Sequence, residues 1–465
     1  MHSPNGTGDQ FPDGFLWAVA SAAYQVEGAT DRGGRHPSVW DRFSSTSGNV
    51  KHNHTGEPAC GSYDDPERDA QLIADLGCGG YRFSVSWPRV IPEGTGPANE
   101  EGLAYYDRLV DALLDRGVQP WVTLFHWDLP TSLHDRGGWL SPESPGWFER
   151  YAKVVVERLG DRVHHWFTFN EPQIFIGHGY LNGVHAPGLS LSRADGLRIS
   201  RNVLLAHGRG VQAIRAASPK PCKVGWAPVG AVGCPADDRP ETLEAARLWT
   251  HAVHDDVKHW WAQSALFSDP AILGRWPDGM EAAFGGDMPP IEDADLDTIH
   301  QPIDFYGVNI YSAARITAEG KVAERQAGFP ETAFGWAVEP DCLYWGPRLI
   351  HERYQLPVYI TENGLASMDW IHHDGQVHDL GRIDYLCRHL HALRRAIADG
   401  VDVGGYFQWS ILDNFEWAEG YAKRFGLVYV DYRTGERLPK RSYHWFSEVI
   451  RSNGSSIPSR LHPIG

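Results

Sequence analysis

Two glutamates stand at the ends of apolar, strand-like runs, and each has an asparagine beside it. Glu171 follows Asn170 in the run HHWFTFNEPQ, and Glu362 precedes Asn363 in the run PVYITENG. Two carboxylates that face each other across a substrate suit glycoside hydrolysis, in which one donates a proton to the leaving oxygen and the other attacks or activates water. A single glutamate at a strand end more often caps a helix or pairs with an arginine. Two of them in matching surroundings favour the catalytic interpretation.

Eight apolar runs of this kind recur along the chain. They cover residues 15–25, 80–87, 119–127, 164–172, 222–229, 303–312, 357–364 and 403–411. Between them lie segments with apolar residues at helical spacing, such as ERDAQLIADLG and EEGLAYYDRLVDALLDRG, in which Gly77 and Gly117 are placed to end the helices. Near-continuous apolar strands that alternate with helices indicate a parallel sheet covered by helices. Eight of them, closed into a ring, predict a (β/α)8 TIM barrel with extended βα loops.

The carboxyl ends of the strands are where such barrels carry their chemistry. Polar or aromatic side chains end nearly every predicted strand: Gln25, Arg82, Trp87, His126, Trp127, Asn170, Glu171, Asn309, Tyr311, Glu362, Asn363 and Trp409. The fifth strand is the exception, although Trp226 there could line the site. Because Glu171 ends the fourth strand and Glu362 ends the seventh, their side chains could face each other over a bound substrate.

Composition limits the classes of partner. The formal net charge of −17 is a poor background for binding a polyanion, so we expect no nucleic-acid partner. No apolar stretch reaches the ~18 residues that a membrane span needs, so we expect no membrane partner either. The first ten residues are polar and lack the apolar core of a signal peptide, which favours a cytoplasmic enzyme.

One domain is expected for most of the chain, because α/β barrels exceed the usual domain length as single units. We predict a flexible N-terminal segment over residues 1–10, a barrel domain over residues 11–455 and a tail over residues 456–465. The oligomeric state stays open.

Cysteines and histidines give no metal signature. The six cysteines are scattered and have no CxxC spacing, so neither a zinc site nor a dense disulfide framework is indicated. His251, His254 and His259 lie close together in the chain, but no third ligand with a suitable motif accompanies the first two. Structural histidines are the better interpretation, and we expect no metal and no cofactor.

The motifs TFNEP and ITENG, in this order and at this distance, closely resemble the acid/base and nucleophile motifs of glycoside hydrolase family 1, the retaining β-glucosidases. The stretches FLWAVASAAYQVEGA, YRFSVSWPR, FHWDLP, GVNIY and WSILDNFEWAEGYAKRFGL match as well, so the resemblance covers nearly the whole chain. It implies that Glu171 is the general acid/base and Glu362 the nucleophile. It also implies that Arg82 favours the ionised form of Glu362 and that Tyr311 donates a hydrogen bond to it.

The spacing of carboxyls in retaining enzymes agrees with these roles. They stand only about 5–5.5 Å apart. Two negative charges that close disfavour joint ionisation, so one carboxyl keeps its proton near neutral pH.

The same resemblance implies a sugar pocket, with polar groups for the hydroxyls and aromatic surfaces for the apolar face of the ring. Its substrate-binding residues are Gln25, His126, Trp127, Asn170, Asn309, Trp336, Trp409, Glu416, Trp417 and Phe425. Asn170 would contact the 2-hydroxyl and Trp409 would stack under the ring. Glu416 would accept from the 4- and 6-hydroxyls and repel a 6-phosphate, which argues against a phospho-glycosidase. The expected partners are small carbohydrates, the β-glucosides.

Gln173 departs from the family pattern, because many members have Trp directly after NEP, where it lines the leaving-group side. A polar Gln173 could favour sugar or water-bridged leaving groups over flat aryl groups. Two other functions stay open at this point. One is a non-catalytic carbohydrate-binding barrel, although such proteins usually lose one of the two glutamates. The other is an enzyme whose main product is transglycosylation, which uses the same covalent intermediate.

Overall fold

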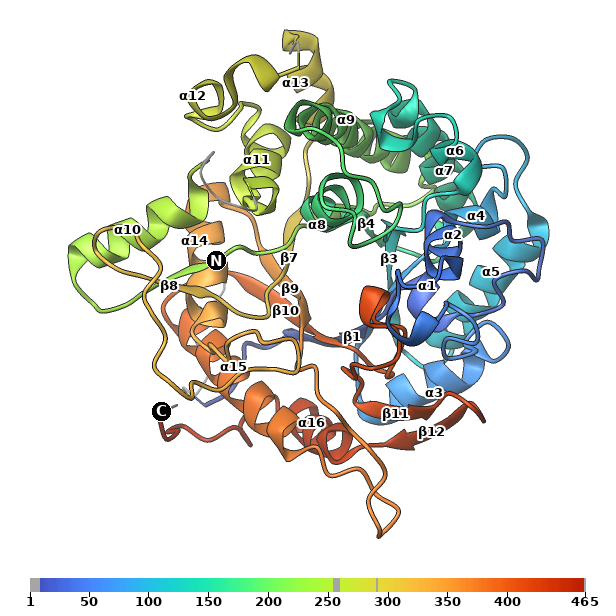
Figure 1. The fold of residues 1–465 in the computed structure, drawn as a ribbon. Coiled ribbons are helices and arrows are strands. Elements are labelled where there is room, and N and C mark those ends of the chain that lie inside the picture. The colour runs from blue at the N-terminus through green and yellow to red at the C-terminus, as the bar shows by residue number, and fades with distance from the viewer. Residues whose placement is uncertain (1–8, 254–259, 290–291, 464–465) are drawn as a thin grey trace.

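Eight parallel strands close into a barrel at the centre of the computed structural model, which describes residues 9–253, 260–289 and 292–463 (Figure 1). The strands are β1 (Leu16–Ala20), β2 (Gly80–Ser84), β3 (Gln119–Phe125), β4 (His165–Asn170), β5 (Lys223–Ala227), β7 (Phe305–Asn309), β9 (Val358–Asn363) and β10 (Val403–Trp409). Their order around the ring is β1-β10-β9-β7-β5-β4-β3-β2. Each strand lies within one of the eight apolar runs, so the predicted (β/α)8 TIM barrel is confirmed.

Aromatic side chains fill the inside of the barrel. The ring centroid of Trp121 lies 5.2 Å from that of Phe407, 5.6 Å from that of Phe305 and 6.0 Å from that of Phe167. The Arg82 guanidinium in turn lies 4.9 Å from the Phe167 ring centroid. These rings therefore form a packed floor, and a buried cation rests on it.

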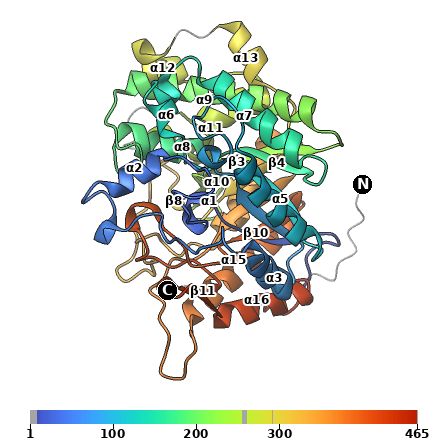
Figure 2. The same ribbon diagram turned by 90° about the vertical axis from the view of Figure 1, so that its right-hand side faces the viewer.

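Long helices cover the outside of the barrel, as the side view in Figure 2 shows. They are α3 (Pro66–Leu76), α5 (Glu100–Leu114), α7 (Ser144–Leu159), α9 (Arg193–Ala217), α10 (Pro240–His251), α14 (Cys342–Tyr354), α15 (Leu380–Ala398) and α16 (Arg441–Arg451). α3 ends as predicted before Gly77, whose φ of 93° is a conformation that glycine adopts readily. α5 ends at Leu114, earlier than predicted, and Gly117 (φ 74°) then turns the chain toward β3.

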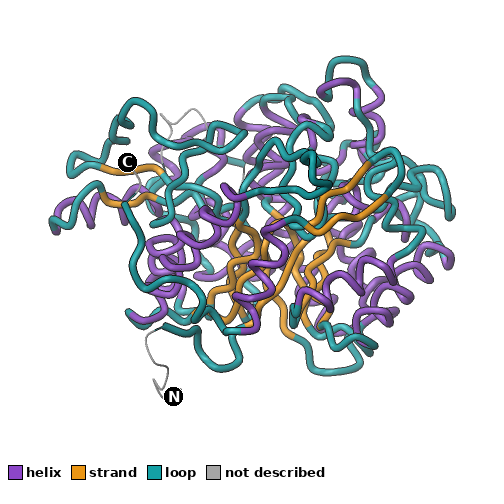
Figure 3. The backbone as a smooth tube through the Cα atoms, turned by 90° about the horizontal axis from the view of Figure 1, so that it is seen from below, coloured by secondary structure: helices purple, strands orange, loops and turns teal. Residues whose placement is uncertain are grey.

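Shorter elements occupy the loops between strands and helices, where Figure 3 shows much irregular chain around the barrel. The short helices are α1 (Ala23–Val26), α2 (Val39–Ser45), α4 (Trp87–Val90), α6 (Thr131–His134), α8 (Pro172–Ile176), α11 (Ser264–Ser268), α12 (Met280–Phe284) and α13 (Asp293–Ile299). Two small sheets pair β6 (Gly233–Pro235) with β8 (Ala314–Ile316) and β11 (Val428–Asp431) with β12 (Glu436–Pro439). The sequence patterns predict neither of these sheets.

Both described ends of the chain pack near α15. Arg394 of α15 donates to the carbonyl oxygens of Asp9 and Ile457, and the Ile457 side chain is buried. Residues 1–8, which make up most of the predicted N-terminal segment, lie outside the described residues, and the predicted boundaries at residues 10 and 455 stay predictions. All six cysteines are free. Among the helices in the described part of the chain, none is long and apolar enough to span a membrane.

Candidate active site

Glu171 stands between the end of β4 and the start of α8, in an unusual backbone conformation. Its φ of 43° and ψ of 65° place it in the left-handed region, which typically costs a residue other than glycine about 1–3 kcal/mol. Its N–H donates to the carbonyl oxygen of Ala227 at 2.8 Å, and Pro172 begins α8 directly after it. Contacts with neighbouring elements therefore hold the Glu171 backbone in a conformation that is unfavourable for a glutamate.

The Glu171 carboxyl is buried beside a neutral donor. Asn309 Nδ2 of β7 donates to Glu171 Oε1 at 2.8 Å, and only 7% of the glutamate is exposed. Burial and the nearby charge of Glu362 raise the pKa of the Glu171 carboxyl to about 8. These surroundings favour the protonated form of the Glu171 carboxyl.

The Glu362 carboxyl, on β9, has a cationic partner instead. Arg82 Nη1 donates to Glu362 Oε1 at 2.8 Å, and the Tyr311 hydroxyl donates to Glu362 Oε2 at 2.8 Å. Burial raises the pKa of Glu362 above its usual value, and Arg82 and the Tyr311 hydroxyl offset part of this rise by stabilising the charged form. Of the two carboxyls, Glu362 is thus the one whose surroundings favour the anion.

A network of amides joins the two carboxyls. Arg82 Nη2 donates to Asn170 Oδ1 at 2.5 Å, and Asn309 Nδ2 donates to the same oxygen at 3.0 Å. Asn170 Nδ2 lies 3.0 Å from His126 Nε2, and Thr361 donates to Asn309 Oδ1 at 2.7 Å. Side chains from four strands and from His126, which follows β3, therefore fix one another, and this holds both carboxyls in place relative to each other.

A cavity of about 500 Å³ opens over these carboxyls. Its walls include these residues singled out from the sequence: His126, Trp127, Asn170, Glu171, Tyr311, Trp336, Glu362, Trp409, Glu416, Trp417 and Phe425. Three more, Gln25, Arg82 and Asn309, lie behind the walls, and each donates to a carboxyl group that faces the cavity. The structure thus brings the predicted residues together in one place.

Glu416 and Trp417 form a wall of the cavity at the start of the turn η7 (Trp417–Glu419). Gln25 Nε2 donates to Glu416 Oε2 at 3.4 Å, and burial and the charges of Glu362 and Glu171 raise the pKa of Glu416 to about 8. The Trp417 ring centroid lies 4.5 Å from that of Trp127. Both tryptophans have positive φ, 48° and 82°, so this wall shares the backbone strain seen at Glu171.

Further residues line the cavity that sequence reasoning missed. They are Ile174, His178, Val184, His185, Val229, Gly230, Ser312, Phe334, Ala418 and Glu419. Ser312 and Phe334 stand close in the chain to Tyr311 and Trp336, which is a signal that could have found them. Ile174 lies in the short helix α8, and the others come from loops and short turns, whose course apolar periodicity does not predict.

The sequence matches the family model described as Glycosyl hydrolase family 1 over residues 7–455. The chain belongs to this family. Beta-glucosidase A of Thermotoga maritima is 43% identical over 450 residues, which are 96% of this chain and 98% of that protein. Beta-glucosidase of Agrobacterium sp. is 42% identical, with 100% and 99% of the two chains covered. The solved structure of the family 1 β-glucosidase from Thermotoga maritima superposes with a TM-score of 0.88, at 42% identity and with 96% and 99% coverage. The resemblance stated from the motifs is confirmed.

Gln173 does not lie where the sequence comparison with other family 1 hydrolases suggested. Its side chain is fully buried, outside the cavity lining, and bonds the backbone of Val229. Gln173 therefore does not line the cavity, whereas its neighbour Ile174 does, and the preference for sugar or water-bridged leaving groups stays a prediction. Trp226 also lies elsewhere, because its ring packs against His207 of α9 at 4.8 Å and not in the cavity.

Of the three histidines considered as metal ligands, only His251 lies within the described residues. His251 is buried, and its Nε2 lies 3.2 Å from the Leu349 carbonyl oxygen. His254 and His259 lie outside the described residues. Within residues 9–253, 260–289 and 292–463, no group of three His, Cys, Asp or Glu side chains is arranged to hold a metal ion.

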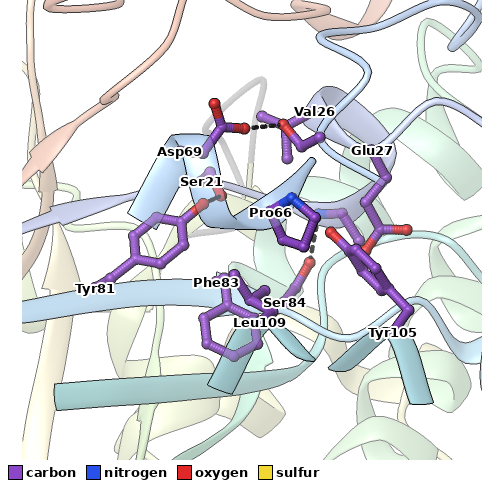
Figure 4. A pocket seen from close by; sticks show the side chains of 12 residues that line it. Ser21, Val26, Glu27, Pro66, Asp69, Tyr81, Phe83, Ser84, Tyr105 and Leu109 are labelled. Atoms are coloured by element: carbon purple, nitrogen blue, oxygen red, sulfur yellow. Dashed lines mark hydrogen bonds between the residues drawn. The ribbon is translucent and has the colours of Figure 1, made fainter. Parts of the chain in front are cut away.

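A second, much smaller cavity lies outside the barrel, between β2 and the helices α3 and α5 (Figure 4). Its volume of about 10 Å³ is near the least that holds one water molecule. The polar side chains around it are paired, as Ser21 and Tyr81 are in Figure 4, and Glu27 accepts from Arg89 and Tyr106. This cavity is too small for a substrate.

Proposed function

We propose that this family 1 hydrolase is a retaining β-glucosidase, which removes terminal non-reducing β-D-glucosyl residues from oligosaccharides or glycosides. The observation that carries the proposal is the unequal pairing of two buried carboxyls at one cavity. Glu362 accepts from a guanidinium at 2.8 Å, whereas Glu171 accepts from a neutral amide at 2.8 Å. One carboxylate and one carboxylic acid are what double displacement at an acetal carbon requires.

In the first step, Glu362 attacks the anomeric carbon from the α face while the bond from that carbon to the leaving oxygen breaks. Glu171 gives its proton to that oxygen, so the leaving group departs as a neutral alcohol. A glucosyl ester of Glu362 remains. Arg82 and Tyr311 position the attacking carboxylate, because they hold its two oxygens separately.

In the second step, water attacks the anomeric carbon from the β face and the ester bond to Glu362 breaks. The ester carries no charge, so Glu362 no longer raises the pKa of Glu171, and Glu171 now takes the proton of the attacking water. Both carboxyls return to their first protonation states, and the released sugar is β-glucose. An acceptor sugar in place of water gives transglycosylation by the same route.

The walls of the cavity suit a glucosyl unit. We assign the 2-hydroxyl to Asn170 and the apolar face of the ring to Trp409. We assign the 4- and 6-hydroxyls to Glu416, which lines the same cavity. We also propose weaker β-fucosidase and β-galactosidase activity; a 41% identical relative from Bifidobacterium breve, named bifunctional beta-D-glucosidase/beta-D-fucosidase, supports the first.

Natural substrates of the proposed enzyme are short β-glucans derived from cellulose. A 42% identical relative from Thermotoga neapolitana, which covers 96% of this chain, is named 1,4-beta-D-glucan glucohydrolase and supports this proposal. Action in the cytoplasm stays a prediction from the sequence.

A panel of p-nitrophenyl glycosides tests the activity, with β-glucoside, β-galactoside, β-fucoside and β-glucoside 6-phosphate as members. We expect turnover of the first three and none of the 6-phosphate. Proton NMR of the first product checks the stereochemistry, for which we expect β-glucose before mutarotation. No turnover of any β-glycoside would favour a carbohydrate-binding barrel, and α-glucose as first product would refute double displacement. The matched control is Glu362→Gln, which keeps the shape of the site and removes the nucleophile.

A further inference from the structure

The buried side chain of Gln173 bonds a neighbouring loop as a peptide group would. Its Nε2 donates to the Val229 carbonyl oxygen at 3.2 Å, and the Val229 N–H donates to its Oε1 at 3.3 Å. Two residues earlier in the chain, the Glu171 N–H donates to the Ala227 carbonyl oxygen at 2.8 Å. The Gln173 amide therefore continues the pairing of β4 with β5 beyond the ends of both strands.

Val229 is also held from its other side, by the strand that carries Asn309. Residues Val229 and Asn309 form a parallel β-bridge, in which the Asn309 N–H donates to the Pro228 carbonyl oxygen at 3.1 Å and the Gly230 N–H donates to the Asn309 carbonyl oxygen at 2.8 Å. A third bond comes from the Ser264 hydroxyl, which donates to the Val229 carbonyl oxygen at 3.1 Å.

These contacts close a ring of four residues. Gln173 is bonded to Val229, Val229 is bridged to Asn309, and Asn309 Nδ2 donates to Glu171 Oε1 at 2.8 Å. Glu171 is joined to Gln173 through Pro172 in the first turn of α8. The ring thus sets the position of Glu171 relative to its own hydrogen-bond donor.

The backbone of Glu171 needs such a constraint. Its left-handed conformation persists only if its surroundings determine it more strongly than its own preference does. The hydrogen bond from the Glu171 N–H to the Ala227 carbonyl oxygen is one constraint on this backbone. The two hydrogen bonds of the Gln173 amide to Val229 are a second constraint, in the first turn of α8. Val229, Gly230 and Ile174 all line the cavity, so the same ring also fixes part of its wall.

We propose that Gln173 is a positioning residue for the general acid: through Val229 and Asn309 it aims the Glu171 carboxyl at the leaving oxygen. The inference rests on the role of Glu171 in the proposed function. It assigns to Gln173 an effect on proton donation and no contact with the substrate. A side chain that only fills space and satisfies the Val229 backbone would affect stability alone.

A series of aryl β-glucosides separates these two roles, because only poor leaving groups need the proton of Glu171. The variants are Gln173→Met, which keeps the length and loses both hydrogen bonds, and Ser264→Ala, which removes the third bond to Val229. Rates are normalised to competent sites by titration with a 2-deoxy-2-fluoro-glucoside. For Gln173→Met we expect kcat/KM to fall about tenfold or more for phenyl β-glucoside and about twofold or less for 2,4-dinitrophenyl β-glucoside, since positioned acid catalysis contributes typically 10²–10⁴-fold. In Ser264→Ala, kcat/KM should also fall more for phenyl β-glucoside than for 2,4-dinitrophenyl β-glucoside, but by smaller factors.

Asn202→Leu is the matched control, because Asn202 is a buried amide that bonds the backbone of Trp139 outside the cavity. This variant should have a lower melting temperature than the parent enzyme. The ratio of its kcat/KM values for the two substrates should equal that of the parent. The inference would be overturned if kcat/KM of Gln173→Met fell by the same factor for every substrate of the series. It would also be overturned if the kcat/KM values of both Gln173→Met and Ser264→Ala equalled those of the parent enzyme. Either result would leave the proposed function standing, because the parent enzyme still turns over the whole series.

Discussion

Arg82 Nη1 lies 2.8 Å from Glu362 Oε1, and both side chains are almost entirely buried, at 1% and 5% exposure. A buried carboxylate that loses such a partner is strongly destabilised, typically by about 3–5 kcal/mol. The same guanidinium also donates to Asn170, so one cation orders the proposed nucleophile and an amide that we propose to bind the sugar. Arg82 thereby places its positive charge beside Glu362, where it stabilises the anionic form of that carboxyl.

Replacing this cation should move the acid limb of the pH profile. In Arg82→Met we expect the pKa of Glu362 to rise, because the stabilising charge is gone, so the acid limb of kcat/KM should move to higher pH along with a large loss of activity. Tyr311→Phe removes only a neutral donor and should give a smaller shift in the same direction. An acid limb that stays in place in both variants would show that neither residue acts on Glu362.

Azide should distinguish the two carboxyls by the stereochemistry of its products. Glu362→Gly opens the α face, so azide should restore turnover and give the α-glucosyl azide from an activated β-glucoside. Glu171→Ala keeps the nucleophile, so azide should attack the glucosyl ester from the β face and give the β-azide. The products are identified by proton NMR. The same anomer from both variants would mean that the assigned roles are wrong.

The alkaline limb should report the proton on Glu171. Because burial and Glu362 raise its pKa to about 8, kcat/KM for a poor leaving group such as phenyl β-glucoside should decline above about pH 8. Asn309→Leu removes a hydrogen bond that lowers this pKa, so the decline should begin at higher pH. The limb should flatten for 2,4-dinitrophenyl β-glucoside, which needs no acid. An equally steep limb for both substrates would point to another group.

Stability should depend on pH through the same carboxyl. Folding raises the pKa of Glu171 from 4.5 to about 8. The stability that its proton provides is therefore fully present below about pH 4.5 and is lost as pH rises toward 8, because the unfolded chain gives up the proton first. In Glu171→Gln this loss is absent, so the melting temperature of the variant relative to the parent should grow from pH 5 to pH 8 and then level off.

The exposed Glu281 provides the control for that measurement. Glu281→Gln should show a constant offset in melting temperature over the same pH range. A constant offset in Glu171→Gln as well would contradict a raised pKa in the folded protein.

The barrel and the two glutamates could be predicted because they rest on local patterns. Each strand is an apolar run of a few residues, and NEP and TENG stand directly at strand ends. The left-handed backbone of Glu171 could not be predicted, since it depends on the bond to Ala227, far away in the chain. The same holds for Trp127 and Trp417, whose conformations are set by contacts between loops.

Gln173 shows where a motif comparison stops. Successive residues of a helix point about 100° apart, so Gln173 and Ile174 of α8 face different directions, and Ile174 is the one that lines the cavity. From the sequence, a polar residue at this place suggested a preference for sugar or water-bridged leaving groups. The Gln173 side chain points into the protein interior, because its amide bonds the backbone of Val229. That pairing depends on the course of the loop after β5.

Trapping the covalent intermediate tests the central claim most directly. The enzyme is incubated with 2,4-dinitrophenyl 2-deoxy-2-fluoro-β-glucoside, digested, and its peptides are identified by mass spectrometry. We predict one 2-fluoroglucosyl group per chain, on the peptide that contains Glu362 and attached to that carboxyl, with release when an acceptor sugar is added. A label on Glu171 or any other residue, or no label in an enzyme that turns over the parent glucoside, would contradict the double-displacement mechanism with Glu362 as nucleophile.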